Sequence, residues 1–287
     1  MVSLSGMPIM DNLFLQCVNV PPIFKYKNGH NKKMNIKQTD NGIEFIIASA
    51  VPDENDKLLF YLTDIEEKCI NDLPYKLGML ENRKVALFTT GIGSYSVAAT
   101  ASLIIHTLQP KYAIFTGMAG AVDTRLKFGD LVIGSHIFGD ESLSQQRDHN
   151  YWPSPVNNQI LPLTYLANST LLSAANKIKK DFDFSVHEGT VTSNDYFPFP
   201  PWFAEIYKEK RVLSIDLESA PFAHVCWLFS IPFIVVRSIS NSVDSDSHVE
   251  FDDAVMSRPT TNAAAFVAKL IKCLEVMPDL KIPNSKT

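Results

Sequence analysis

Apolar segments rich in β-branched residues alternate along this chain with segments of helical composition, and this alternation limits the fold more than any other feature. The strongest strand signals are Ile43–Val51, Lys84–Thr90 and Pro232–Ser240, in which apolar residues dominate. Helical segments such as Ser94–Leu108 and Thr260–Val276 follow or precede them. Strands that alternate with helices imply an α/β protein whose sheet is largely parallel and covered by helices.

The remaining segments continue this alternation. Further strands are predicted at Tyr112–Thr116, Asp130–Ile137, Val186–Thr192 and Val212–Leu217, and further helices at Asp53–Leu62, Leu171–Phe182 and Glu218–Phe229. Neither an internal repeat nor an interior linker interrupts the pattern, so we expect one catalytic domain over residues 41–278. Residues 1–40, which contain a polar basic run, are predicted to be an N-terminal extension, and residues 279–287 a loose C-terminal tail.

Composition excludes several classes of protein. The chain has 287 residues, of which 46% are hydrophobic and 20% charged, as in a globular protein. Its formal net charge of −5 gives no electrostatic case for binding nucleic acid or an anionic membrane. The sequence contains no apolar run long enough to span a bilayer and no evident signal peptide. Its four cysteines are widely separated, which argues against a disulfide framework and favours a cytoplasmic location.

The carboxyl ends of the predicted strands are where a ligand is expected in a sheet of this kind. Glycine turns and carboxylates, including Glu54 and Glu218, follow these strands. Taken alone, each feature has a plain explanation: Gly91-Ile92-Gly93 lacks the third glycine of a dinucleotide loop, and a carboxylate is favoured near any helix N-terminus. No H-x-x-x-H, G-x-S-x-G or Walker A motif is present. The residues by themselves therefore predict a small-molecule pocket that contains carboxylates, without a metal or cofactor.

Three ordered blocks of sequence add a resemblance to a known family. They are FTTGIGSYSVAATASLIIHTLQP at 88–110, FTGMAGAVDTRLKFGDLVIG at 115–134 and SIDLESAPFAHVCWLFSIPFIVVRSIS at 214–240. Here the chain resembles the purine nucleoside phosphorylase superfamily, and most closely its methylthioadenosine/S-adenosylhomocysteine nucleosidases. The similarity extends over roughly residues 43–275, and three blocks in order are more specific than one short motif.

The resemblance implies a single-domain, three-layer fold with a mixed, partly closed central sheet flanked by helices. It also implies cleavage of the bond between a purine and ribose through an oxocarbenium-like transition state. The expected partners are a purine nucleoside and water, and the expected assembly is a homodimer.

The resemblance also implies roles for particular residues. Glu54 matches the carboxylate that positions and activates the water, with Asp53 as the alternative if the register is shifted. Thr90 matches a serine or threonine that steadies the catalytic end of the pocket. Glu218 matches the residue that holds the ribose diol, a task suited to a carboxylate because it accepts two hydrogen bonds. Four further positions belong to the expected substrate-binding set: Leu217 under the sugar, Asp216 where the family has its first glutamate, and Gly91 and Ser240 at their strand exits.

The purine end carries Phe197, which matches an aromatic residue stacked on the base. It also carries the main departure from the family pattern, because Asn241 stands where adenine-cleaving nucleosidases have an aspartate that protonates the leaving base. An amide donates and accepts hydrogen bonds but cannot act as an acid. The enzyme therefore either prefers 6-oxopurines or is a weakened or non-catalytic binder, unless another acid, such as Asp244 or Asp246, replaces the aspartate.

The nucleophile is predicted from the absence of a cationic phosphate site. Related hexameric phosphorylases have an arginine on the strand before the glycine-rich segment, where this chain has Phe115, and no arginine lies in 43–60. A phosphate dianion in a pocket requires such donors. We therefore expect a hydrolase. A phosphate-dependent phosphorylase is the second hypothesis, and a nucleoside-binding relative with little or no turnover is the third.

Overall fold

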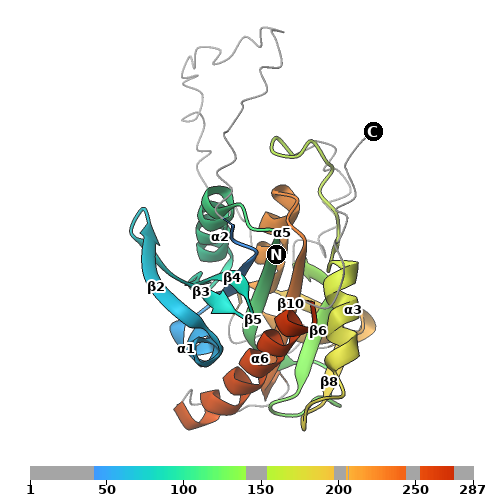
Figure 1. Ribbon diagram of the computed structural model, residues 1–287. Helices are drawn as coiled ribbons and strands as arrows, with labels where there is room; N and C mark the ends of the chain where they lie inside the picture. Colours follow the sequence, from blue (N-terminus) through green and yellow to red (C-terminus); the bar gives the residue numbers. More distant parts are fainter. Residues whose placement is uncertain (1–41, 140–153, 197–204, 206, 244–252, 275–287) are drawn as a thin grey trace, which may run out of the picture. The chain divides into compact units, whose positions relative to one another are not determined.

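Ten strands form one mixed sheet in the computed structural model (Figure 1). The structure describes residues 42–139, 154–196, 205, 207–243 and 253–274, with side-chain burial in the last range from residue 257 on. The chain divides into two units, residues 1–39 and 40–287, and all described residues belong to the second. The predicted extension over 1–40, the tail over 279–287, Phe197, Asp244 and Asp246 lie outside the described residues.

The order of strands across the sheet is β10-β6-β8-β9-β5-β1-β4-β3-β2, and β7 pairs with β6. The strands are β1 (Phe45–Ser49), β2 (Thr63–Ile70), β3 (Leu73–Leu80), β4 (Arg83–Thr89), β5 (Tyr112–Ala121), β6 (Leu131–Gly139), β7 (Tyr165–Leu166), β8 (Val186–Ser193), β9 (Val212–Asp216) and β10 (Phe233–Ser242). β10 pairs with β5 as well as with β6. The strands β5, β10, β6, β8 and β9 thus form a closed ring, and the partly closed sheet implied by the family resemblance is confirmed.

The largely parallel sheet predicted from the alternation of strands and helices is wrong. Five strand pairings are parallel and five are antiparallel. One cause is the β2–β3 hairpin at the open edge, which was not predicted because β2 is almost entirely exposed and neither strand contains a continuous apolar run. The other is ring closure, which brings β9 against β5 and β6 against β10 in antiparallel register.

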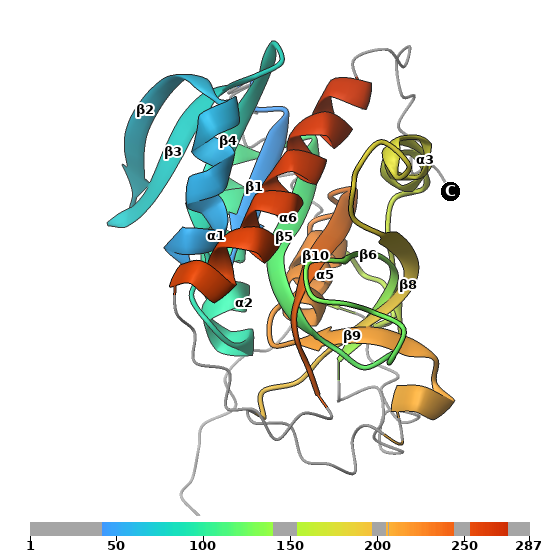
Figure 2. The same ribbon diagram turned by 90° about the horizontal axis from the view of Figure 1, so that it is seen from below.

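Helices cover both faces of the sheet and make the fold three-layered (Figure 2). They are α1 (Pro52–Asp56), the 3-10 helix η1 (Lys57–Tyr61), α2 (Ser94–Leu108), α3 (Ser169–Ile178), α5 (Ser219–Leu228) and α6 (Asp253–Leu274). Successive residues of a strand point to opposite faces, so β1 contributes to two cores. Phe45 and Ile47 pack with α3 and α6, whereas Ile46 and Ala48 pack with α2 and α5. This two-sided burial explains the continuous apolar run of β1.

Individual elements follow the predicted ranges with two differences that matter for the site. The predicted helix over Asp53–Leu62 is instead the short helix α1 followed by the 3-10 helix η1. The predicted strand Tyr112–Thr116 continues to Ala121, because the glycine-rich segment pairs with β10 on one side and β9 on the other. That segment is therefore a strand and not a turn. Among the described helices, none is both long and apolar enough to cross a membrane.

Candidate active site

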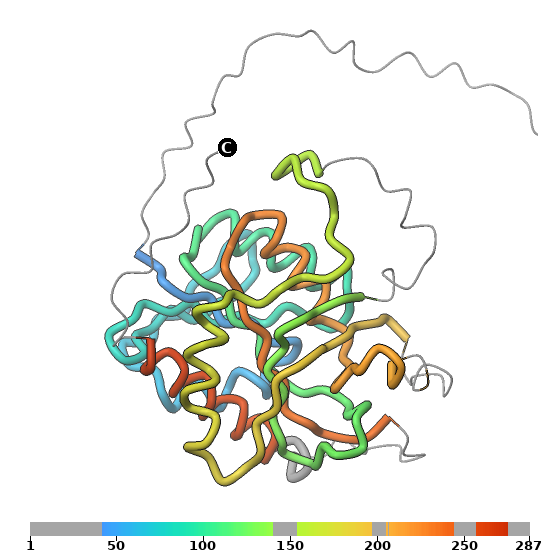
Figure 3. The backbone as a smooth tube through the Cα atoms, turned by 90° about the vertical axis from the view of Figure 1, so that its right-hand side faces the viewer, coloured from blue at the N-terminus to red at the C-terminus, as the bar shows by residue number. Residues whose placement is uncertain are grey.

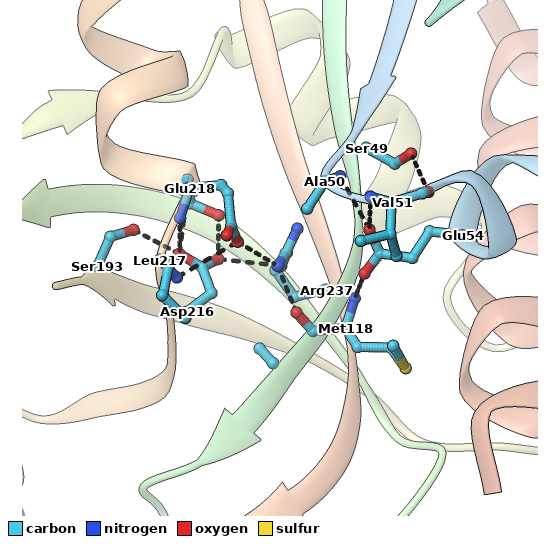
Figure 4. A network of polar contacts seen from close by, with 12 residues as sticks. Ser49, Ala50, Val51, Glu54, Met118, Ser193, Asp216, Leu217, Glu218 and Arg237 are labelled. Atoms are coloured by element: carbon cyan, nitrogen blue, oxygen red, sulfur yellow. Dashed lines mark hydrogen bonds and ion pairs between the residues drawn. The ribbon is translucent and has the colours of Figure 1, made fainter. Parts of the chain in front are cut away.

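Four of the predicted site residues, Glu54, Asp216, Leu217 and Glu218, lie on the two sides of β5 near its carboxyl end (Figure 4). In the β5–β10 pairing, Gly117 lies opposite Arg237 and Gly120 lies opposite Asn241. Gly120 also pairs with Ile215, one residue before Asp216 in β9. Strand pairing alone therefore brings together residues from segments that lie about a hundred positions apart in the sequence.

Glu54 lies in α1 with its carboxylate turned toward β5. It is 4% exposed, whereas Asp53, the alternative, is exposed. The Oε2 atom of Glu54 accepts the N–H groups of Ala50 and Val51 at 2.9 and 3.3 Å, and Oε1 accepts the N–H of Met118 at 2.7 Å. Burial raises the pKa of Glu54 above its ordinary value, while the Arg237 guanidinium and the three N–H donors act in the opposite direction.

Gly117 makes the approach of Glu54 to β5 possible. Its φ of +146° is in the region that favours glycine, and a Cβ at this position would lie 2.4 Å from Oε1 of Glu54. A real Cβ cannot approach an oxygen so closely. The glycine is therefore required for the contact between the carboxylate and the backbone of β5.

Asp216 ends β9, and its carboxylate is fully engaged with protein groups. Oδ1 accepts the N–H of Glu218 at 3.0 Å and that of Ser219 at 2.9 Å, and also the hydroxyl of Ser193. Oδ2 accepts the hydroxyl of Ser219 and lies 3.0 Å from Nε of Arg237. These contacts fix the first turn of α5 and leave Asp216 little capacity for a ligand.

Glu218, two residues further, has longer and fewer contacts. Its Oε1 accepts the N–H of Gly93 at 3.2 Å, and its Oε2 accepts the N–H of Leu217 at 3.3 Å. Oε2 also lies 3.5 Å from Nη2 of Arg237. Burial raises the pKa of Glu218 to about 7, and the negative charge of Asp216 adds to the effect, whereas Arg237 opposes it. Its remaining lone pairs are free to accept hydrogen bonds from a bound molecule.

Arg237 connects the two halves of the site, and the sequence analysis assigned it no role. It is 1% exposed, and besides Asp216 and Glu218 it donates to the carbonyl of Met118 through Nη2. Its guanidinium lies 5.0 Å from the ring centroid of Phe115, so this aromatic residue supports the arginine from one side. The signal that could have identified it is a lone arginine in the apolar run of β10, since a buried charge requires partners.

The result is a continuous polar network from one side of β5 to the other. Glu54 bonds the N–H of Met118, the carbonyl of Met118 accepts from Arg237, and Arg237 pairs with Asp216 and Glu218 (Figure 4). The network holds three carboxyl groups and one guanidinium. Its formal charge is therefore negative whenever at least two of the carboxyl groups are ionised.

Thr90 and Gly91 close the site on the side of β4. The hydroxyl oxygen of Thr90 lies 3.1 Å from the carbonyl oxygen of Ser49 and 2.9 Å from that of Gly91, and its single hydrogen can be donated to either. The N–H of Gly91 donates to the carbonyl of Ala50 at 3.1 Å. These bonds join the end of β4 to the segment that leads into Glu54.

Ser240 and Asn241 lie at the end of β10, where the register between Ile239 and Asn241 is irregular. The hydroxyl of Ser240 donates to Oδ1 of Asn241 at 2.8 Å. Asn241 is half-buried, as is Leu217, so both side chains remain reachable. The hydrogen bond from Ser240 orients the amide so that its NH₂ group is the part left for a ligand.

The loop after β8 borders a pocket of about 470 Å³. Its lining includes Ser193, Asn194, Asp195 and Tyr196 from this loop, together with Ser94 and Tyr95 at the start of α2. Because Ser193 also bonds Asp216, the pocket adjoins the polar network.

Comparison with known proteins supports this architecture. The family model described as "Phosphorylase superfamily" matches residues 44–272. A 5'-methylthioadenosine/S-adenosylhomocysteine nucleosidase of Maridesulfovibrio salexigens is 30% identical over 230 residues, which is 79% of this chain and 97% of that protein. The corresponding protein of Bacillus pumilus is 27% identical over 233 residues, covering 80% and 99% of the two chains.

Solved structures agree with this chain in fold. The Neisseria meningitidis 5'-methylthioadenosine/S-adenosylhomocysteine nucleosidase in complex with methylthio-immucillin-A gives a TM-score of 0.71 at 25% identity, covering 80% of this chain and 98% of that one. Futalosine hydrolase of Helicobacter pylori gives a TM-score of 0.70 at 21% identity over 80% of this chain and 98% of that one. The fold is thus shared by proteins named for different substrates. With the family model covering most of its length and a closed, mixed sheet of the same architecture, this chain belongs to the phosphorylase superfamily.

Proposed function

We propose that this protein is a purine nucleosidase, which hydrolyses the N-glycosidic bond of a nucleoside of the methylthioadenosine/S-adenosylhomocysteine type or of a 6-oxopurine nucleoside. The observation that supports it best is the network that joins Glu54 to Glu218 through Met118 and Arg237. A single nucleoside bound at this network has one acid at its sugar hydroxyls and another at its anomeric carbon.

Glu54 acts as the general base in this proposal. Water attacks the anomeric carbon, its proton passes to Glu54, and the carbon–nitrogen bond breaks with its electron pair moving to the purine. A pKa raised by burial makes Glu54 a better proton acceptor near neutral pH than an exposed glutamate. The three backbone N–H donors hold the carboxylate in place before the reaction.

Glu218 holds the ribose diol, with Leu217 against the sugar. The long contacts of Glu218 support this role, because its oxygens still have capacity for two hydroxyl groups. Asp216, whose oxygens are engaged by α5 and Arg237, is a positioning residue and not a ligand of the sugar. The carboxylates around the sugar stabilise the positive charge that develops in an oxocarbenium-like transition state.

Water is favoured over phosphate as the nucleophile by the charge of the network. Its guanidinium, Arg237, is engaged by Asp216, Glu218 and the carbonyl of Met118, and is stacked on Phe115. A phosphate dianion would have to displace these partners and approach three carboxyl groups. That arrangement disfavours an anion and leaves room for a neutral water molecule.

The base lies against Ser240 and Asn241 in this proposal. The NH₂ group of Asn241 can donate to a purine nitrogen or to a 6-oxo group, but it cannot supply a proton. Leaving-group activation by hydrogen bonding suits a 6-oxopurine. The relatives named above for methylthioadenosine and S-adenosylhomocysteine favour an adenine nucleoside.

We further propose a homodimer in the cytoplasm. Exposed apolar side chains gather in the segment before α3, which projects from the body of the protein in Figure 3. Val156, Ile160, Leu163 and Leu166 are each more than half exposed there, and such a strip is typical of an interface. The described cysteines, Cys69, Cys226 and Cys273, are all free, as expected in a reducing compartment. Light scattering on purified protein tests the dimer.

The activity is tested by following base release from methylthioadenosine, adenosine and inosine, each with and without phosphate. Release that does not depend on phosphate supports the proposal, and the fastest substrate identifies the base. An absolute requirement for phosphate identifies a phosphorylase instead. Tight binding without release identifies a nucleoside-binding relative.

A further inference from the structure

Asp195 forms a contact that connects the loop after β8 with the start of α2. Its Oδ1 accepts the N–H of Ser94 at 2.9 Å, across 101 positions of sequence. The residue before α2, Gly93, has no side chain to cap the helix. Asp195 therefore provides, from a distant loop, an acceptor for one of the N–H groups at the start of α2 that have no partner within the helix.

The neighbouring N–H group of the same turn goes to a different part of the site. Gly93 donates to Oε1 of Glu218 at 3.2 Å, while Ser94 donates to Asp195. Of these two consecutive N–H groups, that of Gly93 bonds Glu218, the residue proposed to hold the ribose, and that of Ser94 bonds the loop after β8. A shift of this turn would move both acceptors together.

Internal bonds make the loop after β8 a defined piece of structure. Asn194 is buried, its Nδ2 donates to the hydroxyl of Tyr207 at 3.1 Å, and its Oδ1 accepts the N–H of Tyr196 at 2.9 Å. Its backbone N–H donates to the carbonyl of Asp216 at 3.0 Å. The bond from Asp195 to Ser94 adds a connection between this loop and the start of α2.

We propose that Asp195 is a positioning residue that couples the base-binding loop to the turn holding Glu218, and that it thereby sets the affinity for the nucleoside. This inference rests on the proposed function, because it assumes that the loop after β8 contacts the base. Asp195 acts only through its hydrogen bond to Ser94, so an uncharged acceptor of the same shape can replace it.

Two substitutions of Asp195 and one control separate this role from a general loss of stability. Asp195→Ala removes the acceptor, whereas Asp195→Asn keeps an oxygen in the same place and removes the charge. Asn168→Ala is the matched control. Asn168 caps α3 by accepting the N–H groups of Thr170 and Leu171, both at 3.1 Å, and α3 packs on the opposite side of the sheet from α2.

The measurements are KM and kcat for base release by the full-length protein and hydrogen exchange of the Ser94 amide. We expect Asp195→Ala to raise KM about fivefold, the change that corresponds to loss of one hydrogen bond, with kcat changed less than about twofold. Exchange of the Ser94 amide becomes faster. Asp195→Asn restores both values to near wild type, and Asn168→Ala lowers stability without changing KM.

The proposal is overturned if Asp195→Ala leaves KM and Ser94 exchange unchanged. It is also overturned if Asp195→Asn fails to rescue, or if Asn168→Ala raises KM equally. Should the wild-type protein release no base, the proposed function fails separately. Ser94 exchange and nucleoside affinity from calorimetry then test Asp195 on their own, and unchanged affinity in Asp195→Ala contradicts the coupling.

Discussion

The two ends of the site are built differently. At the end proposed to hold the sugar, Glu54, Asp216, Glu218 and Arg237 are all buried and linked to one another or through the backbone of Met118. At the end proposed to hold the base, Asn241 is half-buried, and its described side-chain contact is a single hydrogen bond from Ser240. Removing Asp216 or Arg237 from the first group disturbs several others, whereas Asn241 can change with little effect on its surroundings.

This difference separates what the fold requires from what specificity requires. A network of buried charges tolerates little substitution, because each unpaired charge left behind is costly. A reachable amide at the end of a strand can be exchanged without such a penalty. The departure from the family pattern lies at Asn241, which is where the structure imposes the fewest constraints.

The largest effect on the reaction is expected from Glu54→Gln. Loss of the general base should lower kcat by about 10²–10⁴-fold, while nucleoside affinity stays near wild type. Asp53→Asn is the matched control, because Asp53 is the exposed neighbour of Glu54. Steady-state kinetics and calorimetry on both variants test this. Equal losses of kcat in the two variants would mean that Glu54 is not the general base.

Asp216→Ala should be the most destabilising substitution at the sugar end. It leaves Arg237 without its nearest ion-pair partner and removes the acceptor for the first turn of α5. Breaking a buried pair in this way costs about 3–5 kcal/mol in the free energy of unfolding. Asp181→Ala, which breaks the exposed pair with Lys269, should cost less than about 1 kcal/mol in urea unfolding. Similar values for both would show that the network is not a unit.

Glu218→Gln should weaken binding with little loss of stability. Hydrogen bonds to a charged group contribute about 1.5–3 kcal/mol, so we expect KM to rise by about 10–100-fold while kcat changes less. Because an amide fills the same space and still accepts from Gly93, its melting temperature should stay close to that of the wild type. A variant that unfolds as readily as Asp216→Ala would remove the distinction between the two acids.

The pH dependence of Glu218 should follow from its raised pKa of about 7. The ionised form binds the diol, so KM should fall as pH rises through about 7, and Glu218→Gln should remove this dependence. Stability should change in the opposite sense. The Glu218 carboxyl binds its proton more tightly in the folded state than in the unfolded state. Its contribution to the free energy of unfolding is therefore full below pH 4.5, the ordinary pKa, and is lost as the pH rises to about 7. Kinetics and urea unfolding from pH 5 to 8 measure both trends.

The smallest structural effect is expected at the base end. Asn241→Asp should raise turnover of adenine nucleosides by about 10²-fold at most, because it restores a group able to share a proton with the base. Its free energy of unfolding should stay within about 0.5 kcal/mol of wild type, as for other substitutions outside a buried network. Base release from methylthioadenosine and inosine is the measurement, and unchanged or lower rates with adenine would mean that the acid comes from another residue.

The sequence predicted most elements of the sheet but not its topology. Helix α2 begins and ends where its composition indicates, at Ser94 and Leu108. The β2–β3 hairpin was missed because β2 is almost entirely exposed, although apolar residues do alternate along β3 at Leu73, Tyr75, Leu77 and Met79. The ring of five strands could not be derived from the alternation of elements, since pairing of β10 with both β5 and β6 depends on contacts far apart in the sequence.

For the site, the family resemblance pointed to Glu54 ahead of Asp53 and to Glu218 as the ribose ligand, but the residues alone offered no physical reason to prefer Glu218 to Asp216. Both Asp216 and Glu218 follow the same strand, and only their hydrogen bonds show that the first is fully engaged and the second is not. Arg237 received no role because its partners lie on β5, β9 and α5, which only the folded chain brings to it.

The sequence by itself determined the class of fold, the positions of most strands and helices, and the presence of an amide at 241, because these depend on local composition and on short motifs. The tertiary structure decided how the sheet closes, which carboxylates share one arginine, and which of them keeps oxygens for a ligand. Those properties arise from burial and from hydrogen bonds between distant segments, and neither exists until the chain has folded.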